Sequence, residues 1–157
     1  MLVKKYLALF LVCAFCNGGT STLDSYEIST DLKGSEDVLV QILDIYKNYS
    51  SNPEQALDII WDFAHPDNKE ITGPKENFEK MLLSEPYNAI LDLKEYSFTK
   101  TVATENNEHY EIKILAKNNS YFEVTWVFQY DDCSVGSKNQ CWLTIAVTAP
   151  SYYESGV

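Results

Sequence analysis

The sequence predicts an α+β domain in which N-terminal helices pack on a curved, four-stranded antiparallel meander. Apolar residues recur at helical spacing as far as Leu91 and alternate with polar residues after it. Helices that precede an antiparallel sheet pack on one of its faces. The 157 residues, 45% of them hydrophobic, are enough for one such domain with its own core.

The charge balance excludes one class of partner. The chain has 23 acidic residues against 12 basic ones, a formal net charge of −11, and every basic residue is lysine. Without arginine it has no planar donor for phosphates or base edges, and its charge repels nucleic acid. We therefore predict no nucleic-acid partner.

The N-terminus has the pattern of a secretory signal peptide. Lys4 and Lys5 precede an uncharged apolar stretch over residues 6–16, and small polar residues follow over 17–21. A membrane-spanning helix needs about 20 apolar residues, so this stretch predicts no stable membrane span. We expect a signal peptide over residues 1–19 and a protein that is secreted or resides in the secretory-pathway lumen.

The predicted domain covers residues 35–150, after a flexible lead-in over 20–34 and before a C-terminal tail over 151–157. Ser35 is the predicted N-cap of the first helix, because acidic residues follow it and apolar residues recur from Val38 to Tyr49. Asn52 and Pro53 predict the start of a second helix, which ends before Pro66.

A third helix is predicted from Gly73-Pro74, and a short helical segment over residues 86–91. Polar turns then separate four runs of alternating residues, as in an antiparallel meander. The apolar members of these runs are Tyr96 and Phe98; Tyr110, Ile112 and Ile114; Phe122, Val124, Trp126 and Phe128; and Leu143, Ile145 and Val147.

Two cysteines follow the predicted signal peptide, and they flank a turn-rich loop. In an oxidising compartment, Cys133 and Cys141 predict a disulfide that closes the last hairpin. A reactive thiol pair is the alternative, but the Cys-x-x-Cys spacing is missing. Asn48-Tyr49-Ser50 and Asn118-Asn119-Ser120 are glycosylation acceptors, which gives Asn48 and Asn118 as candidate modified residues.

Four segments carry a resemblance to a known superfamily. They are Phe63-Ala64-His65-Pro66, Gly73-Pro74-Lys75-Glu76-Asn77-Phe78-Glu79-Lys80-Met81, Pro86-Tyr87-Asn88-Ala89-Ile90-Leu91 and Trp142-Leu143-Thr144-Ile145. Over residues 37–148 the chain resembles the nuclear-transport-factor-2-like superfamily, and most closely a small uncharacterised family within it.

The resemblance implies a cone-shaped α+β domain. The long cysteine-flanked loop departs from the short aspartate-glycine turn of that family. The superfamily includes isomerases, cyclases, dehydratases and plain binding or dimerisation modules, so the resemblance leaves the function open.

His65 and Asp62 are the candidate catalytic residues. An acid or base in the cone could be a histidine or an aspartate, and the two residues lie near the end of the second helix. The alternative is that His65 caps this helix through its last carbonyls. No ordered set of ligands predicts a metal site, and no glycine-rich loop predicts a nucleotide, so we expect no cofactor.

Aromatic residues make up 13% of the chain and suggest a pocket for an apolar ligand. The alternative is that they fill the core. The opposite face of the third strand, from Tyr121 to Gln129, is a candidate surface for a homodimer or another partner. The pocket candidates are Tyr46, Trp61, Phe78, Phe122, Trp126 and Phe128.

Three functions are compatible with these patterns. The first is a secreted, non-enzymatic domain that binds a ligand or a partner. The second is a small isomerase-like or dehydratase-like enzyme acting on an apolar substrate inside the cone. The third is a cystatin-like protease inhibitor, although the Gln-x-Val-x-Gly loop of such inhibitors is missing.

Overall fold

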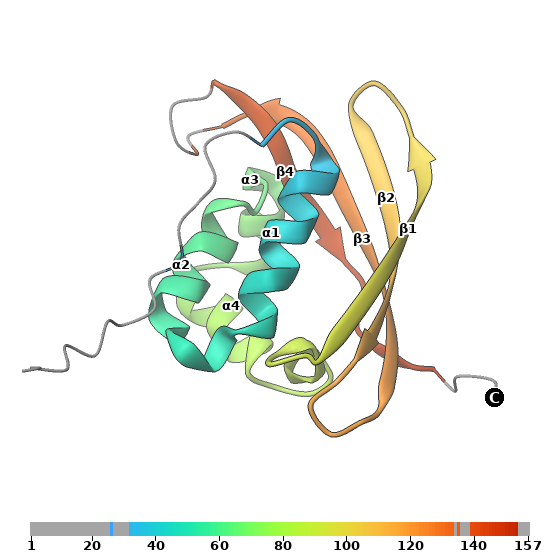
Figure 1. Cartoon of the computed structure of the whole chain (residues 1–157). Coiled ribbons are helices and arrows are strands. Elements are labelled where there is room, and N and C mark those ends of the chain that lie inside the picture. The colour runs from blue at the N-terminus through green and yellow to red at the C-terminus, as the bar shows by residue number, and fades with distance from the viewer. Residues whose placement is uncertain (1–25, 27–31, 134, 136–138, 154–157) are drawn as a thin grey trace, which may run out of the picture.

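The computed structural model describes Tyr26 and residues 32–133, 135 and 139–153. The predicted signal peptide and most of the predicted lead-in lie outside this part of the chain. Four α-helices precede an antiparallel sheet, and Figure 1 shows them gathered on one face of that sheet, which is open and curved. The α+β class and the antiparallel meander are confirmed at this level.

Helix α1 (Ser35–Lys47) buries the apolar face that the spacing predicts. Its N-cap is Gly34, however, and not Ser35. The Asp37 carboxylate, in the first turn, reaches back and accepts from the backbone N–H groups of Lys33 (2.8 Å) and Gly34 (3.2 Å). Ser35 lies inside the first turn, where its side chain is buried against the sheet.

Helix α2 (Pro53–Asp62) begins as predicted, because the Asn52 side chain accepts from the Gln55 N–H over 3.3 Å. A single 3₁₀ turn, η1 (Tyr49–Ser51), connects it to α1. Helix α4 (Lys75–Leu82) and the 3₁₀ turn η2 (Tyr87–Ile90) correspond to the third helix and the short helical segment.

Helix α3 (Pro66–Thr72) has no counterpart among the predicted elements. His65 caps it: the ring Nδ1 accepts from the Asp67 N–H over 3.1 Å. The predicted capping role of His65 was therefore placed on the wrong helix, since His65 begins α3 and does not end α2. Pro66 occupies the first turn, and Gly73, with φ of 86°, ends the helix in a conformation that favours glycine.

The sheet has the order β1-β2-β3-β4, and every pair of neighbouring strands is antiparallel. A short fifth strand pairs with β3 beside β4, with Phe122 opposite Tyr152. The sheet thus continues into the segment that the sequence assigned to a tail. The strands are β1 (Glu95–Ala103), β2 (Asn107–Leu115), β3 (Tyr121–Asp132), β4 (Gln140–Val147) and β5 (Ser151–Tyr152).

A bulge in β4 breaks its predicted alternation. Val127 pairs with Ala146 and Phe128 with Thr144, so Ile145 is an additional residue in β4. Leu143 and Thr144 are consequently both buried although they are consecutive. On its other edge, β4 pairs in parallel with Ala64, through His65 N–H to Thr144 O (2.9 Å) and Thr144 N–H to Phe63 O (2.8 Å).

The hydrophobic core lies between the helices and the concave face of the sheet. Cys133 and Cys141 form the predicted disulfide, with Cα atoms 5.8 Å apart. Of the helices in the described residues, none is long and apolar enough to cross a membrane. The most completely buried large side chains are Trp126, Tyr110, Phe63, Phe128, Leu39, Ile42, Leu43, Leu82, Ile90, Leu93, Ile112 and Ile114.

Candidate functional site

A cavity of about 280 Å³ lies between the helical layer and the C-terminal half of β4. Helices α1, α2, α3 and α4 contribute to it, as do η2 and the centre of β3. Most of its lining is apolar. The described residues that line it are Tyr46, Ile60, Ala64, Asn68, Ile71, Thr72, Phe78, Met81, Leu82, Tyr87, Ile90, Trp126, Thr144, Ile145, Ala146 and Val147.

Three of the six aromatic pocket candidates line this cavity: Tyr46, Phe78 and Trp126. Tyr46 and Trp126 meet edge to face, with ring centroids 5.9 Å apart. They come from α1 and β3, which are separated by most of the domain in sequence. The pattern of large residues at core spacing therefore also identified part of a cavity.

The other three candidates lie elsewhere. Trp61 is half-buried and packs on Phe78, with centroids 5.3 Å apart, but does not line the cavity. Phe128 is fully buried in the core. Phe122 lies near the end of the sheet against Tyr152, at a centroid distance of 6.1 Å.

The Tyr46 hydroxyl is the most distinctive polar group of the cavity. The residue is only 3% exposed, and within the described part of the chain its hydroxyl makes no hydrogen bond. Burial, with a smaller contribution from Tyr49, raises the pKa of Tyr46 well above its ordinary value. The phenol therefore stays neutral and can donate or accept one hydrogen bond.

Four other residues of the lining, Trp126, Thr144, Asn68 and Thr72, are hydrogen-bonded to one another. Trp126 Nε1 donates to Thr144 Oγ1 over 2.9 Å, and Asn68 Nδ2 donates to the Thr144 carbonyl over 3.2 Å. Thr72 Oγ1 donates to Asn68 Oδ1 over 3.1 Å. Among the described residues of the lining, the hydroxyls of Tyr46 and Tyr87 take no part in these bonds, and Tyr46 is the more deeply buried of the two.

Helix α3 borders the cavity but has no buried residue of its own. Ile71, which lines the cavity, is 87% exposed. The helix is attached to β4 by the Asn68 side chain and by the backbone of its cap residue, His65. An exposed apolar residue at the edge of a cavity is a feature of ligand entrances as well as of contact surfaces.

The catalytic candidates do not reach this cavity, since neither His65 nor Asp62 is among the described residues that line it. Both ring nitrogens of the buried His65 are engaged: Nδ1 accepts from Asp67, and Nε2 lies 3.1 Å from Asp131 Oδ2. Asp62 is exposed. No free base is therefore positioned by this pair.

A polar cluster that the sequence patterns did not indicate joins the start of α1 to the sheet. The Ser35 hydroxyl contacts Tyr110 OH at 2.6 Å and also donates to the Glu108 carboxylate. Lys100 Nζ lies 2.8 Å from Glu108 Oε2. Burial would raise the pKa of Glu108, but hydrogen bonds from Lys100, Ser35 and Tyr110 outweigh it and the pKa is lowered.

The two glycosylation candidates are both exposed. Asn48 follows α1, and its Nδ2 donates to the Asp44 carbonyl over 2.9 Å. Asn118 lies in the turn between β2 and β3, where its Oδ1 accepts from the Ser120 N–H over 3.0 Å. Because Oδ1 is engaged with Ser120, the Asn118 Nδ2 atom points away from the turn.

Among the described residues, no group of three histidine, cysteine, aspartate or glutamate side chains is placed to hold a metal ion. Comparisons with family models, with curated proteins and with solved structures found no match for the chain. The site and the topology therefore define a class only: an α+β domain whose helices and curved antiparallel sheet enclose an apolar cavity.

Proposed function

We propose that the chain is a secreted, non-enzymatic binding domain with the cone-shaped architecture of the nuclear-transport-factor-2-like superfamily. In this proposal its ligand is a small apolar molecule that occupies the cavity beside β4. The observation that carries the proposal is a mostly apolar cavity lined by Tyr46, a residue only 3% exposed whose hydroxyl makes no hydrogen bond among the described residues. Pockets of mostly apolar lining with few polar groups are typical of small-molecule sites.

The volume supports a ligand of one or two rings. An apolar protein cavity of ~150 Å³ binds benzene, and the cavity of about 280 Å³ is nearly twice that size. The aromatic rings of Tyr46 and Trp126, which pack edge to face on one another in the lining, favour a flat, unsaturated ligand. The Tyr46 hydroxyl favours a ligand with a single hydroxyl or carbonyl group.

Binding without catalysis is favoured by the placement of the titratable groups. The titratable residues among the described lining are Tyr46 and Tyr87, and burial keeps the Tyr46 phenol neutral. The imidazole of His65 is engaged at both nitrogens outside the lining. Acid–base chemistry needs a group within hydrogen-bond reach of the ligand whose pKa lies near the working pH.

The probe pair 2-naphthol and naphthalene tests this proposal, since the two molecules differ by one hydroxyl. We expect saturable binding of both, followed by chemical-shift changes of the Trp126 indole N–H. Tyr46→Phe should weaken 2-naphthol about 2- to 12-fold, the value of one hydrogen bond of ~0.5–1.5 kcal/mol, and leave naphthalene unchanged.

Two tryptophan substitutions control this titration. Met81→Trp adds bulk to a residue that lines the cavity and should abolish binding of both probes. Leu83→Trp places the same side chain on a residue that is 51% exposed and outside the lining, and should bind as the wild type does. Absence of saturable binding in the wild type, or equal binding by Met81→Trp, contradicts the proposal.

A further inference from the structure

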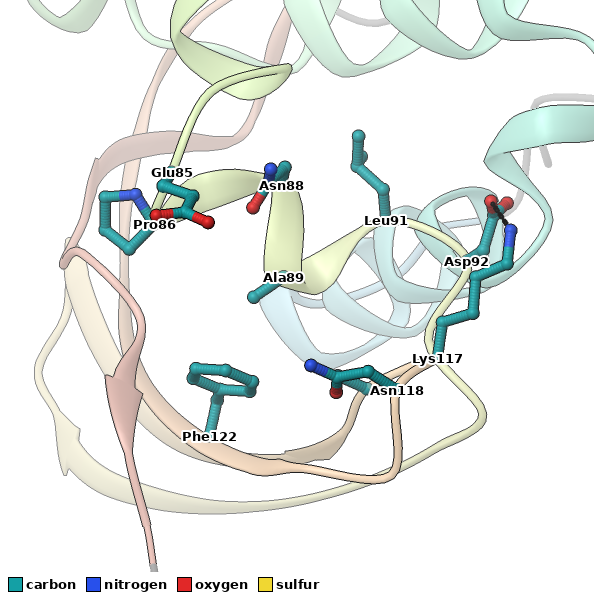
Figure 2. A pocket seen from close by; sticks show the side chains of 10 residues that line it. Glu85, Pro86, Asn88, Ala89, Leu91, Asp92, Lys117, Asn118 and Phe122 are labelled. Carbon is teal, nitrogen blue, oxygen red and sulfur yellow. Dashed lines mark hydrogen bonds and ion pairs between the residues drawn. The ribbon is translucent and has the colours of Figure 1, made fainter.

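A second hollow lies between the β2–β3 turn and the segment from Glu85 to Asp92. It is an open groove of about 550 Å³, and of the described residues none lines both this groove and the apolar cavity. Figure 2 shows Phe122 on one side of it and Glu85, Pro86 and Asn88 on the other. Asp92 and Lys117, paired at 3.0 Å, lie at one end.

Asn118 lies at the edge of this groove, and its amide is held in one orientation. Its Oδ1 accepts from the Ser120 N–H, and the turn is further fixed by the Ala116 N–H to Ser120 O bond of 2.9 Å. The amide nitrogen therefore points away from the turn, and Figure 2 shows it directed toward the side on which Phe122 lies. Asn118 is also the first residue of an Asn-x-Ser acceptor triplet.

The groove has the chemistry that a sugar requires. Phe122 is half-buried and offers an aromatic ring, whose negative face attracts the C–H groups of a sugar. Glu85 and Asn88 supply a carboxylate and an amide that can bond hydroxyl and acetamide groups. The groove thus combines an aromatic ring on one side with polar groups on the other, whereas the cavity proposed for the ligand is mostly apolar.

We propose that Asn118 carries an N-linked glycan and that its first N-acetylglucosamine lies in this groove against Phe122. The inference rests on the proposed export of the chain, because the modification occurs in the secretory pathway. The other triplet differs: Asn48 Nδ2 donates to the Asp44 carbonyl, and Asn48 does not line the groove. A glycan on Asn48 would therefore begin outside this groove.

The first test is the mass of the Asn118 peptide after expression of the full chain, with its own N-terminus, in secreting animal cells. After reduction of the Cys133–Cys141 disulfide, trypsin cleavage at Lys117 and Lys138 gives the peptide 118–138, which contains this acceptor triplet alone. We expect the peptide to carry a glycan, and the Ser120→Ala peptide to carry none. Ser120→Ala keeps the backbone N–H that Asn118 binds. An unmodified Asn118, in secreted or retained protein, overturns the inference.

The second test is whether the first sugar contacts Phe122. An endoglycosidase trims the glycan to one N-acetylglucosamine, and the thermal midpoint of this protein is compared with that of Ser120→Ala. We expect the trimmed wild type to unfold about 4 °C higher, the shift that a contact of roughly 1 kcal/mol gives a domain of this size. In the Phe122→Leu background the two midpoints should agree. An equal difference in both backgrounds overturns the contact.

A third measurement decides if Phe122→Leu fails to fold. In the trimmed wild type, the N-acetyl methyl protons should resonate upfield of their position in a free glycopeptide, because the ring of Phe122 shields them. An unshifted resonance overturns the contact. Ser120→Ala should still bind 2-naphthol, so failure of the glycan inference and failure of the proposed ligand cavity are distinguished.

Discussion

Trp126 and Thr144 are joined by a hydrogen bond between two buried side chains, with the indole Nε1 donating to the threonine Oγ1 over 2.9 Å. The bond links β3 to β4 on the concave face, one residue from the Ile145 bulge. Both residues also line the proposed ligand cavity. The same contact therefore fixes strand register and the orientation of one aromatic ring in the cavity.

Thr144→Val should lower the free energy of unfolding by about 1–3 kcal/mol, because it leaves the buried indole N–H without an acceptor. Thr144→Ser keeps the hydroxyl and should lower the free energy of unfolding by less than Thr144→Val does. Urea denaturation of the three proteins measures both effects. If Val and Ser variants are equally stable, the hydrogen bond has no net value.

His65→Ala should loosen helix α3. The substitution removes the cap on the Asp67 N–H and the contact with Asp131, and an N-cap contributes about 0.5–2 kcal/mol. We expect faster hydrogen exchange of the α3 amides. His65→Asn restores a capping oxygen without reaching Asp131, so it should recover most of the protection. Unchanged exchange in His65→Ala would show that α3 is held by its β4 contacts alone.

Reduction of the Cys133–Cys141 disulfide should lower the free energy of unfolding by about 2–3 kcal/mol, the loop-closure contribution for a separation of this length. The measurement is urea denaturation with and without dithiothreitol. The double variant Cys133→Ser, Cys141→Ala should show the stability of the reduced protein and no response to the reductant. A response of that variant would mean that the reductant acts elsewhere.

Glu108 should make the protein less stable in acid. Its pKa in the folded chain is lowered, so between the folded and unfolded values the unfolded chain binds more protons and stability rises with pH. The contribution is present above the unfolded pKa of ~4.3 and is lost as the pH falls through the folded value. Glu108→Gln should flatten this part of the stability curve. An unchanged acid slope would exclude Glu108 as its source.

The meander was predictable because each strand alternates and each turn is polar. Helix α3 was not, because it contains a single large apolar residue, Ile71, and that residue is exposed. Its formation depends on the His65 cap, on Pro66 in the first turn and on Gly73 at the end. The sequence His-Pro-Asp followed by a glycine was the available signal, and the absence of an apolar period concealed it.

The cavity was predictable only in part, for a reason that lies in β4. Phe122, Trp126 and Phe128 share one face of β3, but the helices and β4 place Trp126 at the cavity, Phe128 in the core and Phe122 by the groove. The alternation of side chains along a strand assigns each residue to one face of the sheet. It does not show at which point along the strand the packing leaves a cavity. The bulge at Ile145 could not be predicted either, because the apolar residues of β4 alternate through it without interruption.

The measurement that tests the ligand proposal most directly is native mass spectrometry of the chain recovered from secreting cells. The proposal predicts a monomer with a discrete extra mass that is released on denaturation and is missing from Met81→Trp but present in Leu83→Trp. A dimer without extra mass, identical for the wild type and Met81→Trp, would contradict it and would move the function to the outer face of β3.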